Sequence, residues 1–354
     1  MRMLYYNDGN LQVVKRENNL ILNGFKENGV DIELYELNDK DWYRNKSKHF
    51  QVYENFLDYA DKTKPDIAFI RGLSFPEHLL PELQARPDFH SRVSFMFYFR
   101  ESARSMARAI TMKSLLEMPQ VKKGFISSMV GKYQDVPNNW KKVNPDKNKY
   151  IIVPEVLHET PKDFKADKIK ARRYFGLPEN KFVCLFFGAI NYSKGLDILL
   201  DAMEYLDDDF ELMVQSFTTD FNYDFDIYRL LGKDKITFNN SFIDDESVGS
   251  LFSACDLVVL PYRNEYSYSS SWVGRLSALA KKPIVVPNFS PFNIFINKFK
   301  TGETFESESP RALADSINRI KLNYGDIMKN ALFEQYVDLT LNWTELTQEI
   351  VKNL

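Results

Sequence analysis

The sequence predicts an α/β protein of two domains, each built on a parallel sheet that helices cover. Short apolar runs alternate with amphipathic stretches, as strands and helices do in βαβ units. The alternation starts again after a linker at 154–161, and 354 residues are enough for two domains. A composition with 44% hydrophobic and 27% charged residues excludes a disordered chain or a fibrous repeat.

The first half of the chain begins with an expected strand at 3–6 and an amphipathic helix at 19–28, which Gly29 ends. Apolar runs, one of them rich in aromatic residues, then recur at intervals that leave room for helices. These further strands are expected at 31–37, 66–70, 93–99, 124–128 and 150–153.

The second half repeats the pattern after the linker. A short helix at 169–175 precedes a buried strand at 182–187, a loop at 188–193 and a helix at 195–206. Further strands are expected at 212–214, 236–238, 257–260 and 284–286, and further helices at 246–255, 271–281, 310–321 and 331–354. We therefore expect one domain at 1–160, a second at 161–330 and a C-terminal helix at 331–354.

Charge and cysteine content exclude several classes of protein. The net charge of -3 argues against a dedicated nucleic-acid binder. Cys184 and Cys255 lie in apolar runs without CxxC spacing, and the four histidines lack metal-ligand spacing, so we expect no metal site and no redox site. The N-terminus is too polar for a signal peptide, and no apolar run approaches the ~18 residues of a membrane span. We expect a cytoplasmic protein and leave peripheral attachment to the inner membrane face open.

The stretch that carries the most chemical information follows the strand at 182–187. There the chain turns at Gly188, and Lys194 stands just before a helix. A helix N-terminus offers free N–H groups and partial positive charge, and a lysine there adds a point charge suited to a diphosphate. The alternative is a solvated lysine at an ordinary βα turn.

Three further runs complete the pattern. They read Phe-Ile-Asp-Asp-Glu at 242–246, Ala-Cys-Asp-Leu-Val-Val-Leu-Pro at 254–261 and Ala-Leu-Ala-Lys-Lys-Pro-Ile-Val-Val at 278–286. With the Lys-Gly turn, they resemble the second domain of retaining nucleotide-sugar glycosyltransferases of the GT4-type family. Gly302 and the Ser-Pro-Arg-Ala-Leu-Ala-Asp-Ser-Ile run match the end of that domain, so the resemblance covers about 150–320.

The resemblance implies a GT-B fold, in which two Rossmann-like domains face a cleft and a C-terminal helix crosses back to the first domain. It implies that 161–330 binds a nucleotide-diphosphate-sugar donor of UDP or GDP type, with Gly188 at the turn and Lys194 on the diphosphate. We expect that no cofactor and no metal is required. The backbone near Phe242 and Ile243 would face the base. Glu265, four residues after Pro261, would act as the catalytic acidic residue that touches the donor sugar.

A run of serines precedes the helix expected at 271–281. Ser269, Ser270 and Ser271 are expected either to hold phosphate or to cap that helix. Counting back from the Ala-Leu-Ala run instead places the first acidic position at Ser269. Ser277 stands where the family has its second glutamate, which binds ribose, so we expect Ser277 among the donor-binding residues.

The chain also departs from the family. Ala189 replaces an arginine, Ser277 replaces the second glutamate, and Gln215-Ser216 replaces a Gly-rich turn, in a chain with only 14 glycines. We therefore hypothesise that Arg263 or Arg275 supplies the missing positive charge, the alternative being an ordinary exposed arginine in each case.

The resemblance assigns the acceptor to the first domain, where we expect Gly9, Arg100 and Arg104. Residues 86–149 hold 13 Lys+Arg against 5 Asp+Glu, a local net charge of +8. Arg100, Arg104 and Arg108 recur every fourth residue and would share one helix face. That face would meet either anionic lipid and phosphate-bearing acceptors or solvent and nearby carboxylates.

The function that we expect is transfer of a sugar, with retention, to an acceptor hydroxyl in polysaccharide, glycolipid or glycan synthesis. Its partners would be a nucleotide sugar and a glycan, a lipid-linked or another hydroxyl acceptor, with no nucleic acid. One alternative is a catalytically impaired GT-B-like accessory or binding protein. Another is a GT-B epimerase or phosphorylase.

Overall fold

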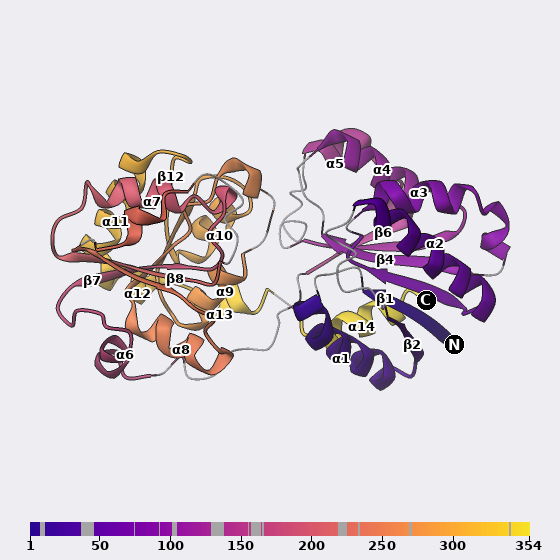
Figure 1. The fold of residues 1–354 in the computed structure, drawn as a ribbon, viewed down its shortest axis with the longest axis horizontal. Helices are drawn as coiled ribbons and strands as arrows, with labels where there is room; N and C mark the ends of the chain where they lie inside the picture. The colour runs from indigo at the N-terminus through magenta and orange to yellow at the C-terminus, as the bar shows by residue number, and fades with distance from the viewer. Residues whose placement is uncertain are drawn as a thin grey trace. The chain divides into compact units, whose positions relative to one another are not determined.

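The computed structural model describes the chain except residues 8–10, 37–45, 74, 92, 101–104, 129–137, 155, 157–163, 165, 219–224, 233, 268, 270 and 340. The described residues form two compact units, each an α/β layer structure (Figure 1). Unit 1 comprises Met1–His158 and Thr340–Leu354, and unit 2 comprises Glu159–Leu339.

Unit 1 contains a parallel six-stranded sheet in the order β2-β1-β3-β4-β5-β6. Its strands are β1 (Arg2–Asn7), β2 (Asp31–Tyr35), β3 (Ile67–Arg71), β4 (Ser94–Arg100), β5 (Val121–Ser127) and β6 (Tyr150–Val153). Its helices are α1 (Leu11–Glu27), α2 (Lys46–Thr63), α3 (Pro76–Gln84), α4 (Met106–Leu116), α5 (Asn138–Val143) and α14 (Trp343–Val351). Side chains alternate between the two faces of each strand, so two apolar clusters form, one under α2 to α5 and one under α1 and α14 (Figure 1).

Unit 2 contains a second parallel six-stranded sheet in the order β12-β11-β10-β7-β8-β9. Its strands are β7 (Phe182–Phe187), β8 (Phe210–Ser216), β9 (Ile236–Asn240), β10 (Leu257–Val259), β11 (Ile284–Pro287) and β12 (Gly302–Phe305). Its helices are α6 (Lys168–Tyr174), α7 (Leu196–Met203), α8 (Asp245–Ala254), α9 (Trp272–Leu279), α10 (Phe292–Phe299), α11 (Pro310–Leu322), α12 (Tyr324–Asn330) and α13 (Phe333–Val337). One apolar cluster lies under α7 and α11, and another lies under α6, α8 and α9 (Figure 1).

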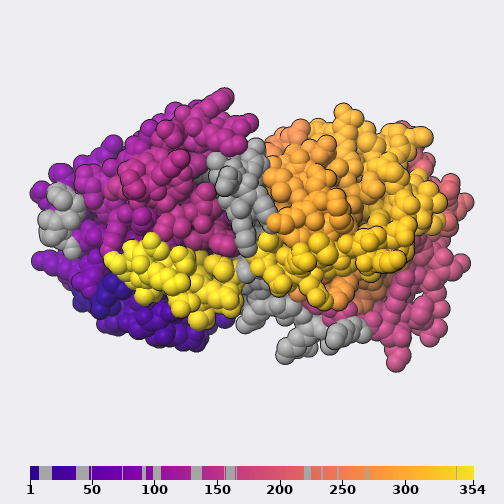
Figure 2. Space-filling view, turned by 180° about the vertical axis from the view of Figure 1, so that it is seen from behind, coloured from indigo at the N-terminus to yellow at the C-terminus, as the bar shows by residue number. Residues whose placement is uncertain are grey.

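The predicted fold class is confirmed, including a C-terminal helix that returns to the first unit, but the helix predicted at 331–354 is not continuous. That stretch divides into α13, which packs on α9 and α10 in unit 2, and α14, which packs on α1 in unit 1. Between them, Leu341 pairs with Val156 as an isolated parallel bridge, and the Asn342 side chain accepts the N–H of Glu345 to start a new helix. Figure 2 shows the yellow C-terminal residues at the surface.

Helix α14 completes the core of unit 1. Trp343, Leu346 and Ile350 are buried in the same cluster as residues of β1 and α1. At Gly24 of α1 an added Cβ would lie 2.6 Å from Thr347 Oγ1, so the two helices approach closely only because Gly24 has no side chain.

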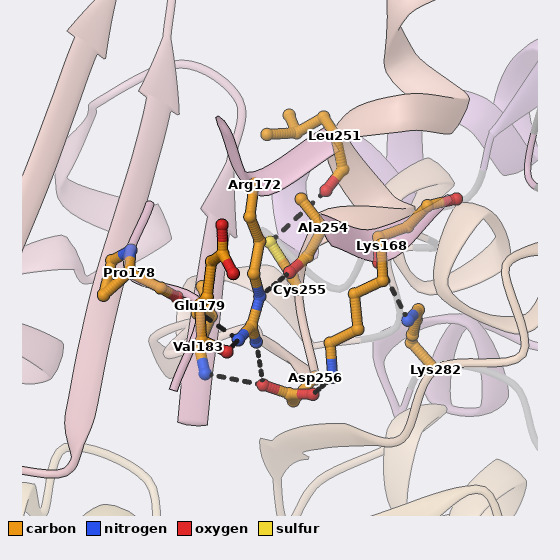
Figure 3. Close-up of polar contacts among 11 residues, drawn as sticks. Lys168, Arg172, Pro178, Glu179, Val183, Leu251, Ala254, Cys255, Asp256 and Lys282 are labelled. Carbon is orange, nitrogen blue, oxygen red and sulfur yellow. Dashed lines mark hydrogen bonds and ion pairs between the residues drawn. The ribbon is translucent and has the colours of Figure 1, made fainter. Parts of the chain in front are cut away.

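A buried ion cluster attaches α6, the first helix of unit 2, to the start of β10 (Figure 3). The Arg172 guanidinium donates to Asp256 Oδ2 at 2.6 Å and to the carbonyls of Ala254, Pro178 and Glu179 at 2.9, 3.2 and 2.6 Å. Asp256 also accepts the Val183 N–H at 2.8 Å and pairs with Lys168. The Arg172 side chain is 2% exposed and that of Asp256 is 8% exposed, so the ion pair between these two residues is made away from water.

Candidate functional site

The topology of the second sheet indicates where a ligand would bind. Strand order reverses between β7 and β10, and in open α/β sheets ligands bind outside the carboxyl ends of the strands at such a point. The loop after β7 carries Lys194, and the loop after β10 carries Tyr262, Arg263 and Glu265. The two loops touch, because Arg263 donates its backbone N–H to the Ser193 carbonyl at 3.0 Å.

Local structure fixes the position of Lys194. The Asn191 side chain accepts the Lys194 N–H and caps a short 3-10 turn, Tyr192–Lys194. Gly195 then takes a left-handed φ of 64° before α7 begins. An added Cβ at Gly195 would lie 2.0 Å from the Pro261 carbonyl oxygen, so only glycine fits between the two loops.

Two tyrosines contact the Lys194 ammonium. Nζ donates to Tyr262 Oη at 2.8 Å and to Tyr266 Oη at 3.1 Å. It also lies 4.1 and 4.3 Å from the centroids of the same two rings, within the range of cation–π contacts. Burial lowers the pKa of Lys194, while the Tyr266 hydroxyl raises it. Among the described residues no carboxylate pairs with this ammonium, so an anion would be its charge partner.

Arg263 does not supply an open positive charge, which corrects our hypothesis for this residue. Its guanidinium donates to Asp197 Oδ1 at 3.0 Å and Oδ2 at 2.6 Å, and to the Tyr192 carbonyl at 2.6 Å. It also lies 4.1 Å from the centroid of the Tyr192 ring. Arg263 thus holds the Lys194 loop to α7 while its own charge is matched by Asp197.

Arg275 is also not an exposed cation at this site. It is 3% exposed in α9 and donates to the Val337 carbonyl at 3.1 Å, which ties α9 to the end of α13. The same helix holds Ser277, which is 1% exposed and donates to the Lys282 carbonyl at 2.8 Å. Ser277 therefore closes the end of α9, and the expectation that it faces the donor is wrong because its hydroxyl is buried and already bonded.

The serines before α9 act at the start of the helix. Ser271 Oγ accepts the Gly274 N–H at 3.3 Å and lies 3.1 Å from Tyr262 Oη, so it caps the helix and contacts the tyrosine that holds Lys194. Ser269 is half-buried and donates its N–H to the Tyr266 carbonyl at 3.1 Å. Ser270 lies outside the described residues.

Glu265 and Gly188 lie at the carboxyl ends of β10 and β7. Glu265 is exposed in the 3-10 turn Asn264–Tyr266, beside Tyr266. The Gly188 N–H donates to the Gln215 carbonyl at 3.0 Å, so it closes the β7–β8 ladder. Both residues are at the edge of the sheet where the strand order places a ligand.

The loop after β9 borders a pocket of about 350 Å³. Phe242 and Ile243 line it together with Asn239, Ser241 and Tyr174. Phe242 is 72% exposed, and its ring meets that of Phe217 edge-on at 6.0 Å. These two rings thus form an exposed aromatic pair beside the carboxyl ends of β8 and β9.

In unit 1, the predicted helix face of three arginines is wrong. Arg100 is the last residue of β4, so it belongs to a strand rather than a helix. Arg108 lies in α4 and donates to the Leu73 carbonyl at 2.9 Å. Gly9 and Arg104 lie outside the described residues.

Several other basic side chains of residues 86–149 are bound within their own unit. They donate to backbone carbonyls, as Lys113 does to Val143 at 2.9 Å, Lys123 to Asn148 at 2.6 Å and Lys149 to Val121 at 2.7 Å. Part of the local positive charge therefore belongs to lysine ammonium groups that already bind backbone carbonyl groups of unit 1.

A polar group in unit 1 was not predicted from the sequence. The strand order there reverses between β1 and β3, whose last residues are Asn7 and Arg71. Arg71 donates to Asn7 Oδ1 at 3.1 Å, and its guanidinium carbon is 5.2 Å from the ring of Trp343. Both residues end short apolar strands, and that position is the signal that could have identified them.

Within the described ranges, no cluster of three or more His, Cys, Asp and Glu side chains could hold a metal ion. In the same ranges, no helix combines the length and the apolar character that crossing a membrane requires.

Comparisons with known proteins agree with the fold. A sucrose-phosphate synthase from Thermosynechococcus elongatus has a TM-score of 0.71 at 16% identity, with 99% of this chain and 98% of that chain covered. The structure of Anabaena HepE in complex with UDP and glucose has a TM-score of 0.68 at 14% identity, covering 99% and 98%. At these identities the likeness shows the fold alone.

Sequence comparison adds a similarity that is confined to part of the chain. An uncharacterized glycosyltransferase of Methanocaldococcus jannaschii is 25% identical over 195 residues, which are 52% of this chain and 47% of that protein. The match thus spans about half the length of that curated relative. Residues 167–335 match the family model described as glycosyl transferases group 1. The chain therefore has the GT-B fold with two Rossmann-like domains, and within unit 2 it is similar to the glycosyl transferases group 1 family.

Proposed function

We propose that the protein transfers a sugar from a nucleotide-diphosphate-sugar donor to an acceptor hydroxyl, with retention, as a GT4-type enzyme of polysaccharide, glycolipid or glycan synthesis. One observation carries this proposal. The Lys194 ammonium is half-buried at the strand-order reversal of unit 2, it touches two neutral phenols, and no described carboxylate neutralises it. An anionic ligand is the partner that such a charge requires.

The chemistry that we propose follows from this charge. As the bond between the sugar and the diphosphate breaks, negative charge grows on the departing phosphate and positive charge grows on the sugar. A fixed ammonium stabilises the first without reorganising, because it is already in place and partly shielded from water. The N–H groups at the start of α7, directly after Gly195, add partial positive charge on the same side. We propose that the Glu265 carboxylate, which is exposed, binds hydroxyls of the donor sugar.

We propose a UDP-type donor as the first choice. Anabaena HepE, which shares the fold, was solved with UDP and glucose. In this chain the base would lie against Phe242 and Ile243, where the exposed Phe217–Phe242 pair offers an aromatic surface for stacking. Unit 1 would bind the acceptor, and we propose Asn7 and Arg71 for that role. The roles predicted for Gly9, Arg100 and Arg104, membrane contact through 86–149 and a cytoplasmic location stay predictions.

A nucleotide-release assay tests the proposal. The purified chain is incubated with a panel of UDP-, GDP- and ADP-sugars and with simple glycosides as acceptors, and the released nucleotide is measured. We expect acceptor-dependent release with at least one UDP-sugar. Lys194→Met should lower kcat/KM by about 10²–10³-fold, the usual effect of removing one group that stabilises a developing anion. Lys329→Met, at an exposed lysine of α12, is the matched control and should leave kcat/KM unchanged.

Two results would contradict this function. Absence of turnover together with nucleotide binding would favour the accessory-protein alternative. Full activity of the Lys194→Met variant would contradict the role that we propose for the Lys194 ammonium. Proton NMR of the anomeric centre in the product decides between retention and inversion.

A further inference from the structure

The Lys194 ammonium is held by an aromatic pair that the family resemblance does not assign. We propose that Tyr262 and Tyr266 are positioning residues of the donor site, which hold the Lys194 ammonium in one place without neutralising it and leave one of its N–H groups for a diphosphate oxygen. This inference rests on the proposed function, in which Lys194 meets the donor diphosphate.

The donor count of the ammonium supports the proposal. A lysine ammonium has three N–H donors and no acceptor. Two of them point to Tyr262 Oη and Tyr266 Oη, at 2.8 and 3.1 Å. The described residues offer Lys194 no third acceptor, so one N–H remains for a ligand.

The pair holds the cation but does not cancel its charge. A carboxylate at the same place would form an ion pair that a diphosphate would have to displace. Phenol oxygens instead accept hydrogen bonds as neutral groups, and burial raises the pKa of Tyr262 further, which keeps it protonated. Two acidic groups of the neighbouring segments are directed to another cation, because Asp197 pairs with Arg263 and Glu308 lies 4.0 Å from the same guanidinium.

The aromatic pair is itself fixed in place. Tyr262 is 1% exposed, and its hydroxyl lies 3.1 Å from Ser271 Oγ, which caps α9. Its ring centroid is 4.3 Å from that of Tyr266 and 5.8 Å from that of Phe292. A rigid partner reduces the entropy that a flexible lysine side chain loses when it binds a ligand.

Tyr266→Phe tests the inference, because it removes one hydroxyl and keeps the ring. Burial lowers the pKa of Lys194 and the Tyr266 hydroxyl opposes that effect, so the variant should lower this pKa further. A lysine with a lower pKa loses its proton at lower pH. The fall in anion affinity at alkaline pH, which we call the alkaline limb, should therefore move to lower pH. The affinity for the anion at neutral pH should fall about 3- to 10-fold, which is the effect of one net hydrogen bond.

The measurement uses calorimetric titration with inorganic pyrophosphate and with UDP between pH 6 and 10. Tyr228→Phe, at an exposed tyrosine of unit 2, is the matched control and should behave as wild type. With pyrophosphate as the ligand, Lys194→Arg/Tyr266→Phe should show no alkaline limb in this range, since a guanidinium keeps its charge there and the Tyr266 hydroxyl is absent. A merely structural role of Tyr266 would weaken binding at all pH values without moving the limb.

The outcomes separate this inference from the proposed function. Tyr266→Phe with wild-type affinity and a wild-type alkaline limb overturns the inference, even if the enzyme transfers sugar. If the protein turns over no nucleotide sugar, but its pyrophosphate binding shows the expected shift of the alkaline limb in Tyr266→Phe, the proposed function is wrong and the proposed role of the tyrosines is supported. Absence of pyrophosphate and UDP binding to wild type overturns both.

Discussion

Arg172→Met should be one of the most destabilising single substitutions in unit 2. The change removes a guanidinium that is 2% exposed and puts an apolar side chain of similar length in its place. Three carbonyl oxygens lose a hydrogen-bond donor, and Asp256 loses its buried charge partner. Asp256 keeps the Val183 N–H and Lys168, whose side chain is 45% exposed.

The structure gives the expected magnitude. Removing one partner of a buried ion pair costs about 3–5 kcal/mol. Because Lys168 still compensates part of the Asp256 charge, we expect the lower end, about 3 kcal/mol. For a domain of this size each kcal/mol lowers Tm by about 2–4 °C, so Tm should fall by about 6–12 °C.

Thermal unfolding followed by circular dichroism measures this change. The neighbouring residue provides the control, because Arg173 is 69% exposed and pairs with Glu179 at the surface. A surface pair contributes about 0–1 kcal/mol, so Arg173→Met should lower Tm by no more than about 4 °C. Equal Tm values for the Arg172 and Arg173 variants would refute the argument that burial sets the cost.

Three further predictions concern the donor site and the core of unit 2. The Gly195→Ala variant should unfold at lower temperature and lose UDP binding, because its Cβ would lie 2.0 Å from the Pro261 carbonyl oxygen. Its control is Gly232→Ala, where φ is also 64° but the space is open, and this variant should lose only about 1–2 kcal/mol of unfolding free energy and keep UDP binding. The Ser277→Ala variant should lose about 1 kcal/mol of unfolding free energy, measured by urea titration, and keep the KM for the donor unchanged. A tenfold rise in this KM would show that Ser277 does contribute to donor binding. Burial raises the pKa of Cys255 to about 12, so a chromogenic disulfide reagent at pH 8 should label this thiol only after unfolding, and labelling of the native protein would contradict its burial.

The sequence predicted the features that depend on neighbours along the chain. Strands β6 and β7 have the predicted bounds, because each is a short apolar run between polar turns. The turn that presents Lys194 could also be predicted, since strand, turn and helix are consecutive. β12 was missed because its four residues show little alternation, and its place beside β11 depends on Gly302, where an added Cβ would be 1.8 Å from the Ile284 carbonyl oxygen.

The partners of the site residues could not be predicted in the same way. Arg263 binds Asp197, 66 residues away, and Lys194 binds Tyr266, 72 residues away, because β7 and β10 are neighbours in the sheet and not in the chain. A formal charge count cannot distinguish the neutralised Arg263 from the unneutralised Lys194. That distinction depends on which loops the strand order brings together.

The position of α14 has a consequence for the order in which the protein can fold during synthesis. Unit 2 is one continuous stretch, whereas unit 1 takes its last helix from beyond residue 340. Until the ribosome has released α14, the apolar face formed by Tyr5, Ile21 and Phe25 lacks Trp343 and Leu346. Domains usually fold in the order of their synthesis, but here the unit that begins first is completed last. A chain truncated after residue 339 should therefore have a protease-resistant unit 2 and a protease-sensitive unit 1.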